Sequence, residues 1–172
     1  LPAFTVGGVL SNNVRSLLLA TVLAPGEEIW VGWWMRGPTS FTPYSFPLRV
    51  YTGSYEAARL YCNASGQLGI YAYEDYWSLN STGYVASGIT VGGWHWVAVS
   101  IERSLSAVAS DGAARLYVNG HLRASLAGLD NYDTCGHGAV KFRMGQCNTS
   151  AVSGTVLDFD EVKIADSYPH PY

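Results

Sequence analysis

The stretch that decides the fold is residues 94–101, which read Trp-His-Trp-Val-Ala-Val-Ser-Ile. Aromatic and β-branched side chains over eight consecutive positions predict a β-strand. Residues 114–118, Ala-Arg-Leu-Tyr-Val, predict a second strand. Asn119-Gly120 then supplies the two positive-φ positions of a tight hairpin turn, and residues 121–125 predict the returning strand.

Segments of the same kind recur along the whole chain, each bounded by Gly, Pro, Asn or Ser. They cover residues 4–10, 17–23, 28–35, 48–51, 58–63, 68–73, 140–145 and 156–165, and Ser65-Gly66 predicts a hairpin turn between two of them. About eleven strands at even spacing, with no helical pattern, predict an all-β fold: a single antiparallel β-sandwich of the jelly-roll type.

Two of these segments carry apolar residues on both faces. Residues 17–23 are almost continuously apolar, which predicts a strand buried on both sides. In residues 28–35, Trp30 and Trp34 share one face while Trp33 and Met35 share the other. This second segment is therefore predicted to be a central strand covered twice, and either set of Trp residues could form the core.

The composition excludes several classes of protein. Of 172 residues, 48% are hydrophobic and 13% charged, so the charge-rich disordered class is excluded. The formal net charge is −3 and the ten basic residues form no run, which argues against a nucleic-acid partner. The longest apolar run, residues 17–24, is too short to span a membrane.

Five motifs, in their order and spacing, resemble the laminin G-like, concanavalin A-like lectin and glucanase jelly-roll superfamily over roughly residues 15–165. They are Trp34-Met35-Arg36, residues 93–99 (Gly-Trp-His-Trp-Val-Ala-Val), residues 115–120 (Arg-Leu-Tyr-Val-Asn-Gly), residues 142–145 (Phe-Arg-Met-Gly) and residues 154–164 (Gly-Thr-Val-Leu-Asp-Phe-Asp-Glu-Val-Lys-Ile). We therefore expect one laminin G-like jelly-roll domain over residues 15–172, preceded by an N-terminal arm or edge strand over residues 1–14.

The resemblance implies lectins, carbohydrate-binding and adhesion domains, virion and filament subunits, and several glycan-cleaving enzymes. Asp158 and Asp160 depart from the Glu-x-Asp-x-x-Glu strand of the laminarinase-like members, so we interpret them as part of a structural closing strand. His95 and Tyr117 are the residues that could serve the Arg, His and Tyr chemistry of the lyases, but His95 lies within a structural motif of the family. We expect no enzymatic activity.

A group of aromatic residues indicates glycan binding. Tyr71 and Tyr73 lie two apart on one strand, and Tyr76 and Trp77 follow after Glu74-Asp75. Sugar rings stack on aromatic faces, while carboxylates accept hydrogen bonds from the sugar hydroxyl groups. These four aromatic residues are the predicted glycan-binding site, with the alternative that half of the rings belong to the core.

A loop with Asp130 and Asp133 offers the hard oxygen ligands that calcium prefers, and calcium is frequent among the laminin G-like proteins. We expect no other cofactor.

Three sequons, at Asn63, Asn80 and Asn148, predict a glycosylated protein, with coincidence in a Ser-rich chain as the alternative. The chain begins at Leu1 without a signal region, which we interpret as a processed secreted protein or an excised domain. The expected location is extracellular, on a cell or virion surface.

The sequence does not decide whether two of its three cysteines form a disulfide, or which two. Cys135 and Cys147 flank a predicted strand and would lie too far apart to bond if it is fully extended, so Cys62 pairing with one of them is at least as plausible. Three reduced thiols are the alternative.

The N-terminal arm suggests a second class of function. Phe4, Val6 and Val9 form an alternating apolar segment that could add a strand to a neighbouring subunit and link a filament. The alternative is that the arm pairs within its own sandwich.

The sequence thus predicts a non-enzymatic attachment domain that binds glycans or surface glycoproteins. The alternative is a self-assembling filament subunit, and a polysaccharide-cleaving enzyme comes third.

Overall fold

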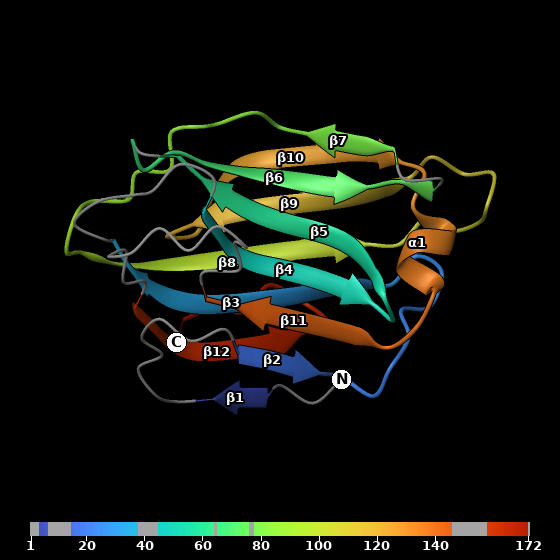
Figure 1. Cartoon of the computed structure of the whole chain (residues 1–172), viewed down its shortest axis with the longest axis horizontal. Helices are drawn as coiled ribbons and strands as arrows, with labels where there is room; N and C mark the ends of the chain where they lie inside the picture. Colours follow the sequence, from blue (N-terminus) through green and yellow to red (C-terminus); the bar gives the residue numbers. More distant parts are fainter. Residues whose placement is uncertain are drawn as a thin grey trace.

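The computed structural model of the chain describes residues 4–6, 15–37, 45–63, 65–75, 78–145 and 158–171. These residues form two packed antiparallel sheets and one short helix (Figure 1). The elements, in chain order, are β1 (Phe4–Val6), β2 (Arg15–Leu18), β3 (Glu28–Arg36), β4 (Ser45–Thr52), β5 (Tyr55–Cys62), β6 (Leu68–Tyr73), β7 (Leu79–Ser81), β8 (Trp94–Glu102), β9 (Gly112–Val118), β10 (His121–Leu129), α1 (Tyr132–Gly136), β11 (Val140–Met144) and β12 (Asp158–Ala165).

The first sheet has the strand order β1-β12-β3-β8-β9-β10, and the second sheet has the order β2-β11-β4-β5-β6-β7. Because every neighbouring pair of strands is antiparallel, the predicted all-β sandwich is confirmed. The β9–β10 hairpin turns at Asn119 (φ 52°) and Gly120 (φ 79°), as the sequence predicts. The turn predicted at Ser65-Gly66 joins β5 to β6.

The core lies between the sheets and is built from alternate residues of each strand. Val31, Trp33 and Met35 of β3 lie on one side of the core, and Leu48 and Val50 of β4 lie on the other. Each of these five residues is at most 1% exposed. Burial of this continuous apolar layer is the main favourable term that holds the two sheets together.

β3 is central, as predicted, and both of its faces are covered. It pairs with β12 on one side and β8 on the other. Trp33 belongs to the core, while Trp30 lies on the outer face and is still only 6% exposed. The cover on that outer face is the chain's own tail, residues 166–171, whose Pro169 packs on Gly32.

The prediction of a doubly buried strand over residues 17–23 is wrong. Only Arg15–Leu18 form a strand, β2, which lies at the edge of the second sheet and pairs with β11 alone. Leu18 is 65% exposed and Val22 47% exposed. Side chains alternate along a strand and only the inner face of this sheet is covered at β2, so Leu17 packs against the core and Leu18 points away from it.

The N-terminal arm pairs within its own sandwich. Phe4, Thr5 and Val6 lie opposite Ile164, Lys163 and Val162 of β12. This confirms the in-chain alternative. Strand donation to a neighbouring subunit, which would require β1 to leave β12, stays a prediction. Val9 lies outside the described residues, and a domain boundary at residue 14 stays a prediction.

The expectation of no helix is wrong at one place, α1, which covers one end of the sandwich (Figure 1). The carboxylate of Asp75 accepts the backbone N–H groups of Asp133 (3.0 Å) and Thr134 (2.6 Å) at the start of this helix. Because this capping carboxylate comes from a residue nearly sixty positions earlier, the cap could not be predicted from the local sequence.

Two of the cysteines lie in the described residues, and both are buried. The thiol of Cys135 is free, and burial raises its pKa to about 12. Cys62 therefore does not pair with Cys135. Pairing of Cys62 with Cys147 stays a prediction, because Cys147 lies outside the described residues.

Among the described residues, no helix is long and apolar enough to cross a membrane.

Candidate functional site

The alternation of β6 decides which aromatic residues can face a ligand. Leu68, Ile70 and Ala72 point into the core, and Tyr71 and Tyr73 point to the outer face of the second sheet, both half-buried. The prediction that these two tyrosines share a face is confirmed. Tyr76 and Trp77, the other half of the predicted glycan-binding set, lie outside the described residues.

Tyr71 and Tyr73 both contact one arginine side chain on this face. The guanidinium of Arg59, on neighbouring β5, lies 5.1 Å from the ring centre of Tyr71 and 5.4 Å from that of Tyr73. It also donates a hydrogen bond to the hydroxyl of Tyr73. Burial raises the pKa of Tyr73, so this hydroxyl stays protonated at neutral pH. The pair is thus an aromatic surface with a cation fixed on it.

The strand registers extend this arrangement across the whole second sheet. Arg59 lies opposite Tyr71 on β6 and opposite Arg49 on β4, and Arg49 lies opposite Arg143 on β11. Ser16 of β2 and Ser81 of β7 continue the line at its two ends. Three arginines from three adjacent strands therefore stand in one transverse row.

A second cation and a third tyrosine stand beside this row. Tyr51 of β4 lies opposite Lys141 of β11, whose Nζ is 4.9 Å from the centre of the Tyr51 ring. The guanidinium of Arg143 is 5.9 Å from the same ring, and Nη1 of Arg49 donates to the Tyr51 hydroxyl at 3.4 Å. Tyr51 thus sits among three cationic side chains.

One carboxylate, Glu56 of β5, lies within this group. Its oxygens are 3.7 Å from Nη1 of Arg49 and 3.3 Å from Nε of Arg59. Burial raises the pKa of Glu56 even though Arg59, Arg49 and Arg143 each lower it. We call Arg49, Tyr51, Glu56, Arg59, Tyr71, Tyr73, Lys141 and Arg143 the basic face. Its four cations and one carboxylate leave a formal charge of +3, in a chain whose net charge is −3.

Of the predicted calcium ligands, Asp130 directly follows β10 of the first sheet and Asp133 lies in the first turn of α1. The backbone N–H of Asp130 donates to Glu74, and burial together with the charges of Asp75, Glu74 and Asp133 raises the pKa of Asp130. Asp75 is already engaged in capping α1. Within the described ranges no group of three or more His, Cys, Asp or Glu side chains is arranged to hold a metal ion. Calcium binding stays a prediction.

The two candidate lyase residues point to opposite sides of the first sheet. His95 is buried on the inner side, where its Nε2 accepts the N–H of Thr90 at 3.0 Å and its Nδ1 lies 3.1 Å from the amide of Asn119. Tyr117 lies on the outer side, against Trp30. These two residues therefore cannot act together on one substrate.

The two aspartates of β12 have structural partners. Asp158 lies 3.9 Å from Arg36, and Asp160 accepts the N–H of Glu161, the residue at a bulge with φ 47°.

Of the three sequons, two fall in the described residues. The side chain of Asn63 closes the turn between β5 and β6: its Oδ1 accepts two backbone N–H groups and its Nδ2 donates to Gln67 at 2.7 Å. Asn80 lies on edge strand β7 and is half-buried. Asn148 lies outside the described residues, and glycosylation stays a prediction at all three positions.

No protein-family model matches this sequence, and no curated protein sequence matches it either. Solved structures do match the fold. An endo-β-1,4-glucuronan lyase from the fungus Trichoderma reesei superposes with a TM-score of 0.60 and 12% identity, over 96% of this chain and 80% of that one. Alginate lyase Aly36B gives a TM-score of 0.57 and 14% identity, over 94% and 79%.

The binding domain of botulinum neurotoxin serotype D gives a TM-score of 0.65 and 12% identity over 98% of this chain, which spans 44% of that domain. At such identities the likeness shows the fold alone: an all-β sandwich shared by polysaccharide lyases and toxin binding domains.

Proposed function

We propose that this chain binds an acidic polysaccharide, one that carries a carboxylate on its sugar rings, across the basic face. The observation that carries the proposal is the row of Arg143, Arg49 and Arg59 on three adjacent strands. Like charges placed directly opposite each other destabilise a sheet. An anionic ligand lying along the row would relieve this repulsion.

The side-chain chemistry suits a carboxylate. A guanidinium presents paired N–H donors that match the two oxygens of a carboxylate, so each arginine can hold one acidic group in a defined orientation. Neighbouring strands lie about 4.8 Å apart, so the row offers charges at a regular short interval. That spacing favours a polymer with repeated acidic groups over a single small anion.

The tyrosines supply the other half of sugar recognition. Tyr51, Tyr71 and Tyr73 flank the arginines with partly exposed rings, on which the apolar face of a sugar can stack. Side chains of Arg49 and Arg59 are 16% and 18% exposed, so their charges are less screened by solvent than those of fully exposed side chains.

The structural neighbours support the same ligand class, since two of them are a glucuronan lyase and an alginate lyase, and glucuronan and alginate are polymers of uronic acids. We further propose that this chain belongs to the laminin G-like superfamily and acts outside the cell. We propose binding without cleavage, because His95 and Tyr117, the two candidate lyase residues, point to opposite sides of the first sheet.

Titration calorimetry with alginate and polyglucuronate, with dextran as the neutral control, tests the proposal. Both acidic polymers should bind and dextran should not, and equal binding of dextran would contradict a site built on charge. A parallel incubation, followed by the ultraviolet absorbance of an unsaturated uronate, tests cleavage. An increase in absorbance that is lost in Tyr73→Phe would replace the binding proposal with a lyase.

A further inference from the structure

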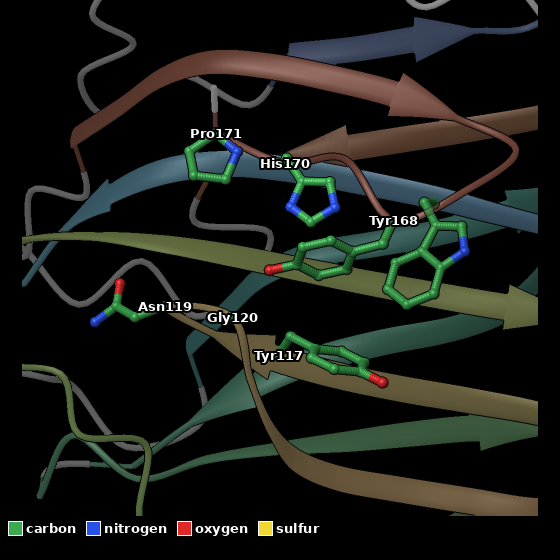
Figure 2. A pocket seen from close by; sticks show the side chains of 7 residues that line it. Tyr117, Asn119, Gly120, Tyr168, His170 and Pro171 are labelled. Atoms are coloured by element: carbon green, nitrogen blue, oxygen red, sulfur yellow. The ribbon is translucent and has the colours of Figure 1, made fainter.

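A separate pocket lies on the far side of the molecule, on the outer face of the first sheet (Figure 2). It has a volume of about 470 Å³, within the usual range for small-molecule sites. Its lining comes from β3 (Trp30), β9 (Tyr117), the β9–β10 turn (Gly120) and the tail (Tyr168 and His170).

The aromatic walls are fixed against one another. The ring centres of Trp30, Tyr117 and Tyr168 lie 5.2 to 5.5 Å apart in tilted or edge-on contacts, and the His170 ring lies 4.8 Å from Tyr168. Such geometry is typical of packed aromatic clusters. The pocket is therefore pre-formed, and a ligand would not have to order its walls.

The tail that completes the pocket is anchored independently of any ligand. Lys163 Nζ donates to the carbonyl oxygens of His170 (3.1 Å) and Pro171 (2.7 Å), and Pro169 packs on Gly32. The opposite rim is held by Asn119, whose side-chain oxygen accepts the N–H of Trp96 at 3.0 Å.

Two polar groups of the lining lack partners. The indole Nε1 of Trp30 and the hydroxyl of Tyr168 are buried, and neither has a hydrogen-bond partner in the described part of the chain. Burial, the largest effect, raises the pKa of Tyr168, while the backbone of Gly120 and the indole of Trp96 are close enough to its hydroxyl to lower that pKa. Figure 2 shows the hydroxyl directed toward the Asn119-Gly120 turn, across the pocket. A buried polar group without a hydrogen-bond partner costs free energy, so a ligand that hydrogen-bonds to these two groups would gain binding free energy.

From these observations we propose that this pocket binds a neutral sugar ring. Among the lining residues that the structure describes, none carries a carboxylate, an amine or a guanidinium, which favours an uncharged ligand over an acidic one. The ring faces of Tyr117 and Tyr168 suit the apolar face of a pyranose, and the sugar hydroxyls supply both acceptors for the indole N–H and partners for the tyrosine hydroxyl. This site is independent of the basic face, which lies on the other sheet.

The test uses the full chain and four probes: the methyl glycosides of glucose, galactose and mannose, and N-acetylglucosamine. Ligand-observed NMR and quenching of tryptophan fluorescence should show saturable binding of at least one probe at millimolar concentration. Tyr168→Phe keeps the ring and removes the hydroxyl, and should weaken that binding about tenfold, the value expected for one lost hydrogen bond. His170→Ala should weaken it as well.

Tyr132→Phe is the matched control, because its ring lies under Arg103, away from both sites, and binding should be unchanged. Absence of saturation by all four probes would overturn the proposal. So would binding of tetramethylammonium in place of sugars, or sugar binding that survives both pocket variants. Alginate binding by Tyr168→Phe should stay intact, which separates failure of this pocket from failure of the basic face.

Discussion

Arg49 and Arg59 lie directly opposite each other in the β4–β5 ladder, and the carboxylate of Glu56 lies within 3.7 Å of both guanidiniums. This arrangement makes Glu56 the internal counter-ion of the basic face. A polyanion that binds here competes with Glu56 for the same two arginines.

Removal of Arg143 is expected to weaken polyuronate binding about tenfold, because one charge-assisted hydrogen bond is lost. Calorimetry with alginate measures the effect, and added salt should reduce the affinity of the wild type more steeply than that of Arg143→Ala. Arg36→Ala is the matched control: it removes an arginine from the first sheet, beside Asp158, and should bind as the wild type does. Equal losses in both variants would mean that only net charge matters.

Polyuronate binding should strengthen as the pH falls from 7 toward 5. Burial raises the pKa of Glu56 above its usual value of 4.5, so a growing share of Glu56 is protonated as the pH falls, which frees Arg49 and Arg59 for the ligand. Glu56→Gln should bind more tightly than the wild type at pH 7 and should lose most of this pH dependence. Affinity that is independent of pH in the wild type would argue against the counter-ion role.

The same group makes a prediction about stability. A carboxyl whose pKa is raised on folding stabilises the protein fully below its unfolded pKa, and this contribution is lost as the pH rises through the folded value. The free energy of unfolding of the wild type, relative to that of Glu56→Gln, should therefore increase as the pH falls from 7 to 4.5. Urea denaturation of both proteins at the two pH values measures the difference, and an opposite change would show that the ion pairs outweigh the cost of burial.

Gly32 is the position at which the tail meets the first sheet. A Cβ there would lie 2.5 Å from the Trp96 ring and 2.7 Å from the Pro169 ring. Gly32→Ala is expected to lower the free energy of unfolding by about 1–3 kcal/mol through overpacking. Denaturation measures this, and sugar binding in the tail-covered pocket should weaken too. Gly120→Ala, which meets no atom within 4 Å but has φ 79°, separates backbone strain from overcrowding.

Cys135 is expected to be inert to alkylation in the native protein. Its thiol is buried and its pKa is about 12, so almost none of it is thiolate at pH 8. Mass spectrometry after iodoacetamide treatment should find Cys135 unmodified in the native protein and modified after denaturation. Rapid modification of the native protein would show that α1 opens readily.

Much of the fold could be predicted from the sequence because alternation and turn residues are local signals. The β8–β9–β10 meander follows from residues 94–125, and the shared face of Tyr71 and Tyr73 follows from their spacing. The tyrosines of the site could therefore be predicted from the sequence, whereas its row of arginines could not. Arg49, Arg59 and Arg143 each alternate with buried apolar residues, but nothing local indicates that three such positions share one register.

By itself, then, the sequence determined that this protein is a β-sandwich with its hairpin at Asn119-Gly120, because strand alternation and positive-φ turns depend on residues close together in the chain. Only the tertiary structure decided the rest. Strand order brought residue 143 beside residue 49, a remote carboxylate at residue 75 capped α1, and the tail closed a pocket over Trp30. Those contacts join residues far apart in sequence, and their pairing is set by the packing of the two sheets.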